Sequence, residues 1–167
     1  MPNHTALYPG TFDVLSYGHL DIIKRTAAIF DKVIIAVAKN IDKSPIFSVE
    51  ERIEMIEEAT QGINNIIKIC SFSGLTVDFA KENGVKVVIR GLRAVSDFEY
   101  ELQLSMMNKN LNPDVETLFL APSEQYSFLS SKLIKEIARF GGDIKEFVPP
   151  NVEKQTVEKL KSLYIQK

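Results

Sequence analysis

Residues that could bind a phosphate group lie close together near the start of the chain. The sequence reads Tyr8-Pro9-Gly10-Thr11-Phe12-Asp13 and, two residues later, Ser16-Tyr17-Gly18-His19. The first stretch leads from a short apolar strand into a glycine turn, and His19 opens the helix expected after it. A helix N-terminus presents unpaired N–H groups and the positive end of the helix dipole, and glycine lets an anion approach the backbone. The imidazole of His19 adds a hydrogen-bond donor, so this segment predicts a phosphate site.

Two later clusters could bind further phosphate oxygens. Arg90 and Arg93 flank Gly91-Leu92 directly after an apolar run, and their planar guanidinium groups suit bidentate contacts with oxyanions. The other cluster, over residues 122–135, gathers serine hydroxyl groups with Lys132 and Lys135 where a helix should begin. Hydroxyl, ammonium and backbone N–H groups all donate to oxyanions. The clusters together predict a site for a polyphosphate.

The elements that must position these residues alternate along the chain. Short β-branched runs predict strands at 5–8, 32–38, 66–72, 86–90 and 115–121. Segments with helical periodicity lie at 18–30, 49–61, 76–83, 97–111, 131–140 and 152–163. This alternation predicts an α/β fold: a single-domain, Rossmann-like, doubly wound sheet of five parallel strands over residues 1–167. The C-terminal helix, at about 151–164, should pack on the domain or on a neighbouring subunit.

The polar candidates all follow strand ends. Thr11 follows the first predicted strand, residues 39–43 the second, Gly74 the third, Gly91 the fourth and Ser123 the fifth. Ligands of open parallel sheets bind outside the carboxyl ends of the strands, where the strand order reverses. One edge of the sheet should therefore carry the site.

Three local patterns carry further expectations. Ser48 and Glu51 form a capping box, and the charged residues around them (Glu50, Glu51, Arg52, Glu54, Glu57 and Glu58) are expected to form a solvated helix face. Asp13, a short acid after a turn, is typical of a residue that caps backbone N–H groups. The helix over 97–111 is too apolar for a solvated surface, so we expect it to be buried, or shared between the site and a subunit interface.

Composition excludes several classes of protein. A net charge of −2 argues against a protein that coats nucleic acid, because such domains carry a basic excess. The apolar runs are far shorter than the roughly 20 residues of a membrane-spanning helix, and the N-terminus lacks a signal peptide, so we expect a cytoplasmic protein that binds no membrane. The lone Cys70 predicts a small core residue, and no Cys/His spacing suits zinc.

The motifs YPGTFD, GH, RGLR, DFEYE and SFLSS, in this order between Tyr8 and about Glu146, closely resemble bacterial phosphopantetheine adenylyltransferase, in the nucleotidyltransferase superfamily with the T/HxGH signature. The resemblance implies reversible transfer of AMP from ATP to 4′-phosphopantetheine, giving dephospho-coenzyme A and pyrophosphate. It also implies Mg²⁺ bound to ATP oxygens without a carboxylate metal site, a homohexamer of two stacked trimers, and coenzyme A as a feedback ligand.

The same resemblance implies roles for particular residues. His19 would stabilise the transition state at the α-phosphate, and Thr11 would contact both substrates. The ATP contacts would be Thr11, Phe12, His19, Gly91, Leu92, Arg93, Glu101, Tyr126, Ser127, Phe128, Leu129, Ser130, Ser131 and Lys132. The phosphopantetheine contacts would be Thr11, Lys43, Thr76 and Arg90, with Gly74, Leu75 and Tyr100 along the pantetheine arm.

Four positions depart from the family pattern, one of which is Ser44, which follows Lys43 where some relatives carry a second lysine. Ser16 stands where the family usually has threonine, which preserves a hydroxyl group for capping. Lys132 replaces the usual serine or threonine after the serine pair, and Thr76 lies where a larger apolar residue is common.

Two alternatives remain open from the sequence. One is a nucleotidyltransferase of the same superfamily with another acceptor, such as a glycerol-3-phosphate cytidylyltransferase or an enzyme that adenylates nicotinamide mononucleotide. The RGLR-to-DFEYE block favours phosphopantetheine. The other is a catalytically silent nucleotide-binding module, which the intact His19, Arg90 and Arg93 disfavour.

Overall fold

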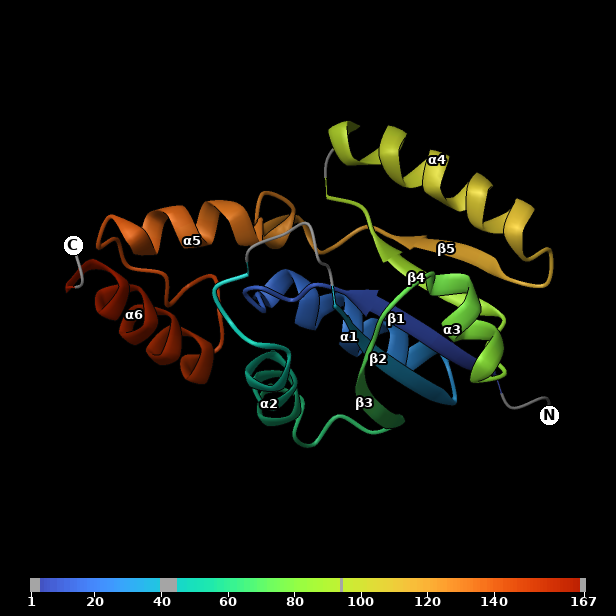
Figure 1. Ribbon diagram of the computed structural model, residues 1–167, viewed down its shortest axis with the longest axis horizontal. Coiled ribbons are helices and arrows are strands. Elements are labelled where there is room, and N and C mark those ends of the chain that lie inside the picture. Colours follow the sequence, from blue (N-terminus) through green and yellow to red (C-terminus); the bar gives the residue numbers. More distant parts are fainter. Residues whose placement is uncertain (1–3, 40–44, 94, 166–167) are drawn as a thin grey trace.

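The computed structural model describes residues 4–39, 45–93 and 95–165. Its centre is a five-stranded sheet in the order β3-β2-β1-β4-β5, and all neighbouring strands are parallel (Figure 1). The strands are β1 (Thr5–Gly10), β2 (Lys32–Ala38), β3 (Ile66–Phe72), β4 (Val87–Gly91) and β5 (Glu116–Leu120). The predicted doubly wound α/β fold is confirmed.

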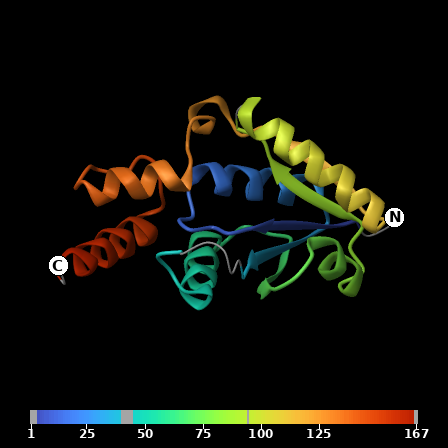
Figure 2. The same cartoon turned by 45° about the horizontal axis from the view of Figure 1, so that its top comes forward.

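Helices cover both faces of the sheet (Figures 1 and 2). They are α1 (Tyr17–Ile29), α2 (Val49–Ala59), α3 (Thr76–Glu82), α4 (Val95–Leu111), α5 (Ser131–Arg139) and α6 (Pro150–Ile165). A short 3-10 helix, η1 (Glu124–Tyr126), which the sequence did not predict, precedes α5. Helices α5 and α6 lie beyond the carboxyl ends of the strands, and α6 packs against α5 and α2.

The central strand shows why the sheet is covered on both faces. Successive side chains of a strand point to opposite faces, and in β1 both sets are apolar. Ala6 and Tyr8 belong to the core that includes Ile22 of α1 and Met55 of α2. Leu7 belongs to the core on the other face, which includes residues of α3. A strand buried on both sides reads as a continuous apolar run.

Side-chain caps fix where α1 and α2 begin. The hydroxyl of Ser16 accepts from the backbone N–H of His19, and the hydroxyl of Ser48 accepts from that of Glu51. In both cases the side chain of the later residue accepts in return from the backbone N–H of the serine. The capping box predicted at Ser48 is confirmed. Ser16, which was expected to cap its helix, forms a second capping box with His19.

The expectation that α4 is buried, or shared between the site and a subunit interface, keeps only its second alternative. Helix α4 is not buried within the chain: Phe98, Tyr100, Met106, Met107 and Leu111 are 46 to 65% exposed. It lies against β5 and α3 along one side only, and periodicity alone does not distinguish burial in a chain from burial by a partner.

Arg52 does not belong to a solvated face, because it is only 2% exposed. It turns inward from α2 because backbone carbonyl groups accept its hydrogen bonds. Within the described ranges, no helix is both long and apolar enough to cross a membrane.

Candidate active site

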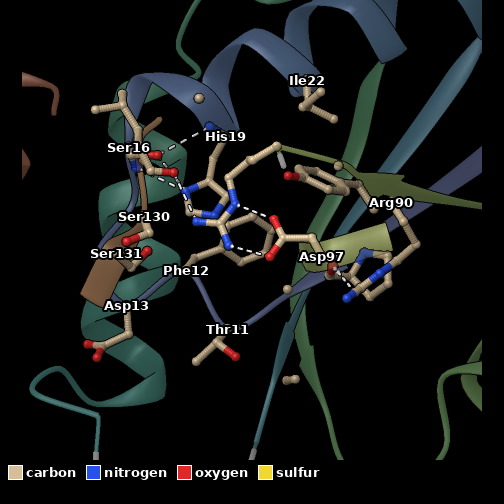
Figure 3. Close-up of a pocket in the computed structure, with 18 of the residues that line it drawn as sticks. Thr11, Phe12, Asp13, Ser16, His19, Ile22, Arg90, Asp97, Ser130 and Ser131 are labelled. Atoms are coloured by element: carbon tan, nitrogen blue, oxygen red, sulfur yellow. Dashed lines mark hydrogen bonds and ion pairs between the residues drawn. The ribbon is translucent and has the colours of Figure 1, made fainter. Parts of the chain in front are cut away.

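A cavity of about 760 Å³ opens at the carboxyl ends of β1 and β4. From β1 the chain adds β2 and β3 on one side of the sheet and then β4 and β5 on the other. The strand order therefore reverses between β1 and β4, which makes this the switch point of the sheet. Figure 3 shows side chains reaching one space from several elements: Thr11 after β1, His19 on α1, Arg90 on β4 and Ser130 before α5. The expectation that one sheet edge gathers the candidates is correct for these residues.

Most of the predicted site residues line the cavity. They are Thr11, Phe12, Ser16, His19, Thr76, Arg90, Gly91, Arg93, Tyr100, Glu101, Leu129, Ser130, Ser131 and Lys132. The predicted residues that do not line it are Gly74, Leu75, Leu92, Tyr126, Ser127 and Phe128. Lys43 lies outside the described residues.

Two of these six residues make aromatic contacts outside the cavity. The ring of Tyr126 stacks on Tyr17 with centroids 6.0 Å apart, and Phe128 meets Phe147 edge to face. These contacts, with a residue of α1 and with a residue of the segment before α6, hold both rings outside the cavity lining. Motif position located this segment, but it could not say which of its side chains face inward.

The ring of His19 is held by the start of its own helix. The backbone N–H of Ser16 donates to Nδ1 of His19 over 3.0 Å, and the hydroxyl of Ser16 lies 3.0 Å from the same nitrogen. Burial, together with the smaller effect of the positive charge of Arg93, lowers the pKa of His19 to about 4. The imidazole is therefore neutral at pH 7 with its proton on Nε2, a donor that carries no charge.

The glycine turn places aromatic rings beneath the site. A side chain at Gly10 would bring its Cβ within 2.8 Å of the Phe12 ring, so only glycine fits there. Phe12 has a φ of 51°, a left-handed conformation that costs a non-glycine residue free energy. Its ring lies edge-on to Tyr8 and His19, with centroids 5.4 and 5.3 Å away. The turn is thus fixed by packing under the imidazole.

Arg90 is held by a carboxylate on α4. Its Nε and Nη2 donate to the two carboxylate oxygens of Glu101 over 2.7 and 2.5 Å, and its Nη1 donates to the carbonyl of Pro9 over 3.2 Å. Hydrogen bonding and charge from Glu101 raise the pKa of Arg90, against the opposing effect of burial. The planar guanidinium group of Arg90 is therefore held in one orientation at the carboxyl end of β4.

Arg93 is also held in place. It forms an ion pair with Asp97 over 3.1 Å and donates from Nη1 to the carbonyl of Leu129 over 2.9 Å. This second bond joins the Arg93 loop to the start of α5. Two of the three predicted phosphate-binding segments thus contact each other directly.

The start of α5 supplies the third segment. Ser130 caps the helix by accepting from the backbone N–H of Leu133, and the hydroxyl of Ser131 donates to the carbonyl of Val14. Lys132 is exposed at the cavity, and in the described parts of the chain no acceptor contacts its ammonium group. It is a cation available to a ligand.

Asp13 has the capping role expected of it. Its carboxylate accepts from the backbone N–H groups of Ile46 and Phe47 and pairs with Lys135 over 2.6 Å. The sequence assigned Lys135 to the anion-binding cluster without recognising this partner. The spacing of the two residues in the sequence carries no signal for it.

The carboxylates of the cavity all have cationic partners. Asp13 pairs with Lys135, Asp97 with Arg93 and Glu101 with Arg90. Over the described ranges, no group of three or more His, Cys, Asp or Glu residues could hold a metal ion. The donors that remain suit anions rather than a metal bound by the protein alone.

Sequence reasoning missed several apolar lining residues. Ile22, Ala38, Pro45 and Phe72 all line the cavity, as does Pro122, which lies within the predicted 122–135 cluster. Tyr8, named as the end of a strand and in the YPGTFD motif but not as a ligand contact, also lines it, and burial raises the pKa of its hydroxyl. Apolar walls give no chemical signal in a sequence, although the position of Ala38 and Phe72 at strand ends could have indicated them.

Comparisons with known proteins identify the family of this chain. Residues 7–137 match the cytidylyltransferase-like family. A relative from Alkaliphilus metalliredigens, named phosphopantetheine adenylyltransferase, is 55% identical over 86% of this chain and 90% of its own length. One from Caldanaerobacter subterraneus subsp. tengcongensis, with the same name, is 53% identical over 93% of this chain and 97% of its own length.

A solved structure from Vibrio parahaemolyticus, provisionally assigned as a nicotinate-nucleotide adenylyltransferase, superposes with a TM-score of 0.69 and covers 95% of this chain and 94% of that one. At 14% identity this likeness shows the fold alone. The family is shown instead by the two closer relatives, which share half of their residues with this chain over nearly its whole length. The chain belongs to the phosphopantetheine adenylyltransferase family.

Proposed function

We propose that this protein transfers AMP from ATP to 4′-phosphopantetheine, giving dephospho-coenzyme A and pyrophosphate. The relatives named for this activity support the substrates. The observation that carries the chemistry is the neutral imidazole of His19, a residue that lines the same cavity as Arg90 and Arg93 and whose Nε2–H donor has no acceptor in the described part of the chain.

In this reaction a phosphate oxygen of phosphopantetheine attacks the α-phosphorus of ATP in line with the departing oxygen. The new P–O bond forms as the bond between the α-phosphorus and the bridging oxygen breaks, and pyrophosphate leaves. The acceptor is already largely a dianion at pH 7, because the second pKa of a phosphate monoester is about 6. The site therefore needs no base, and it has to orient two anions and neutralise their charge.

His19 acts where charge builds up. Its Nε2–H donates to the α-phosphate, whose oxygens gain charge and crowd together in the five-coordinate transition state. Such a donor, fixed in advance by Ser16, stabilises the transition state more than the ground state.

The remaining contacts divide between the two substrates. We assign Thr11, Phe12, Gly91, Arg93 and the residues at the start of α5 to ATP, with Lys132 as an exposed cation for its outer phosphates. We assign Arg90, Thr76 and Tyr100, with Lys43, to phosphopantetheine. Gly74, Leu75, Leu92 and residues 126–128 would contribute only through backbone contacts or after local rearrangement, because they do not line the cavity. Glu101 serves in this proposal to orient Arg90.

Mg²⁺ enters this proposal as part of the nucleotide substrate. Mg²⁺ keeps much of its water shell and binds readily to substrate phosphates. The carboxylates at the cavity are committed to Arg90, Arg93 and Lys135, which supports binding through ATP oxygens.

An assay with a panel of acceptors tests the proposal. The protein is incubated with Mg²⁺ and ATP, and pyrophosphate release is measured with phosphopantetheine, glycerol 3-phosphate or nicotinamide mononucleotide. We expect release with phosphopantetheine only. Release with either of the others and none with phosphopantetheine would favour the related acceptors, which the names of the two relatives do not support.

We also propose that the chain assembles into a homohexamer, acts in the cytoplasm and binds coenzyme A at the substrate cavity. The exposed apolar residues of α4 support an assembly, since a solvated helix rarely exposes so many. Coenzyme A shares the pantetheine arm of the substrate, so the same cavity suits it.

A further inference from the structure

Arg52 is a buried cation outside the cavity. It lies on α2, is 2% exposed and does not line the cavity. In the described ranges Arg52 pairs with no carboxylate. The carboxylate whose charge acts on it most strongly, that of Asp13, is paired with Lys135. Burial lowers the pKa of Arg52, because removing the charged guanidinium group from water costs free energy.

Backbone carbonyl groups are the partners of this guanidinium. Nη1 donates to the carbonyl of Thr11 over 2.7 Å and, more weakly, to that of Ala38 over 3.4 Å. Nε donates to the carbonyl of Ser48 over 3.1 Å. One side chain therefore ties the ends of β1 and β2 to the start of α2, and its shortest bond reaches the turn beside His19.

The bond to Thr11 fixes the direction of the next peptide group. In a trans peptide the C=O and the following N–H point in opposite directions. Since Arg52 holds the carbonyl of Thr11 from outside the cavity, the N–H of Phe12 is aimed away from Arg52. Over the described parts of the chain, no acceptor contacts this N–H, while Phe12 itself lines the cavity.

Stability alone is a poor reason for this arrangement. Burying a charged guanidinium costs solvation free energy, which its hydrogen bonds have to offset. The Phe12 conformation, with a φ of 51°, needs support from its surroundings, and the Thr11 carbonyl is where Arg52 gives it.

We propose that Arg52 is a positioning residue for AMP transfer, which holds the Thr11–Phe12 peptide so that its N–H faces the reacting phosphates, with the buried positive charge of Arg52 behind that peptide. This inference rests on the proposed function, because the phosphates are those of ATP and phosphopantetheine. Arg52 acts through Thr11 and touches no substrate.

Steady-state kinetics of Arg52→Met and Arg52→Lys test the proposal. We expect Arg52→Met to lower kcat by about 10- to 100-fold, while KM for ATP changes less than about threefold, because a small displacement of a donor matters most in the transition state. Arg52→Lys keeps the charge and can reach one carbonyl, so it should recover part of kcat. The control is Thr60→Val, which removes a buried hydroxyl bond at the end of the same helix, far from Thr11. Rates are expressed per folded protein.

The Phe12 amide gives a readout that does not need turnover. In protein labelled with ¹⁵N-phenylalanine, Mg²⁺ and ATP should shift the Phe12 amide proton downfield in the wild type and in Thr60→Val, and much less in Arg52→Met. An unchanged kcat for folded Arg52→Met, or an equal shift in that variant, would overturn the positioning role. Absence of wild-type turnover with phosphopantetheine, together with the expected shifts, would refute the acceptor and leave the positioning of Phe12 supported.

Discussion

The backbone N–H of Ser16 donates to Nδ1 of His19 over 3.0 Å, so the imidazole carries its one proton on Nε2. The helix start thereby sets the tautomer of the residue that would meet the α-phosphate. A charged imidazolium could not accept this bond at Nδ1. The low pKa of His19, about 4, and the hydrogen bond therefore favour the same neutral form.

Protein stability should depend on pH through His19. Its pKa is about 4 in the folded chain and about 6.5 when unfolded, so between these values the unfolded chain binds more protons. The contribution is complete above pH 6.5 and is lost as the pH falls toward 4. Denaturant titrations at pH 7 and pH 4.5 should show a loss of roughly 1 to 3 kcal/mol in the free energy of unfolding from this group. His19→Gln should lack that part of the loss, and an identical loss in the variant would contradict the assignment.

Activity should follow the acceptor phosphate rather than His19. His19 stays neutral down to about pH 4, whereas a phosphate monoester loses its second charge near pH 6. The acid limb of kcat/KM for phosphopantetheine should therefore fall at about pH 6, with a slope of one proton. The limb should keep its position in Ser16→Ala. A limb that moves by a full unit in that variant would assign it to the imidazole instead.

Ser16→Ala separates the cap from the bond that sets the tautomer. The substitution removes the hydroxyl that accepts from the His19 backbone, which should cost about 1 kcal/mol of stability. The backbone N–H of Ser16 still donates to Nδ1, so kcat should fall less than tenfold. Ser16→Thr, the residue usual in the family, should match the wild type in both measurements. A loss in Ser16→Ala as large as that of His19→Ala would mean that the hydroxyl, rather than the N–H, fixes the ring.

The sequence predicted the sheet well because its strands are buried on both faces. Continuous β-branched runs such as 32–38 leave little choice of structure, and β2 and β3 have the predicted bounds. The sequence predicted parallel strands but not their order, since no local signal says which strands pair. The candidate site was located through glycine turns and strand ends, which are local features.

What the sequence could not give is which way a side chain turns when its partner is distant. Arg52 sits in a run of acidic residues and looks solvated, yet its bonds go to carbonyl groups of Thr11 and Ser48. Lys135 and Asp13 form a pair across more than a hundred residues of chain. Such pairs depend on the three-dimensional fold, which a pattern of charges does not encode.

Arg90 and Glu101 should be strongly coupled in phosphopantetheine binding. Arg90→Met removes a cation and leaves the carboxylate of Glu101, only 12% exposed, facing a phosphate without its partner. We expect kcat/KM for phosphopantetheine to fall about 100-fold, roughly 2.7 kcal/mol. Adding Glu101→Gln removes the repulsion, so the double variant should recover at least about tenfold relative to Arg90→Met. Independent effects of the two substitutions in the double-mutant cycle would contradict the coupling.

The exposed apolar side chains of α4 should decide the oligomeric state. Met107 is 63% exposed and Leu111 58%, on a helix that contacts the rest of the chain along one side. A glutamate at either position would place a charge in an apolar subunit contact, so Met107→Glu and Leu111→Glu should lower the mass measured by light scattering to that of smaller assemblies. Gln61→Glu, an exposed substitution after α2, is the control and should leave the mass unchanged.

Activity in the same variants then separates assembly from catalysis. Because Tyr100 and Glu101 line the cavity from the N-terminal part of α4, loss of the subunit contact should loosen the helix and raise KM for phosphopantetheine more than KM for ATP. A wild-type protein that is already monomeric at micromolar concentration, or variants with unchanged mass, would show that α4 is not the contact. In that case its exposed residues would have to be explained by some other partner, because a solvated helix gains nothing from them.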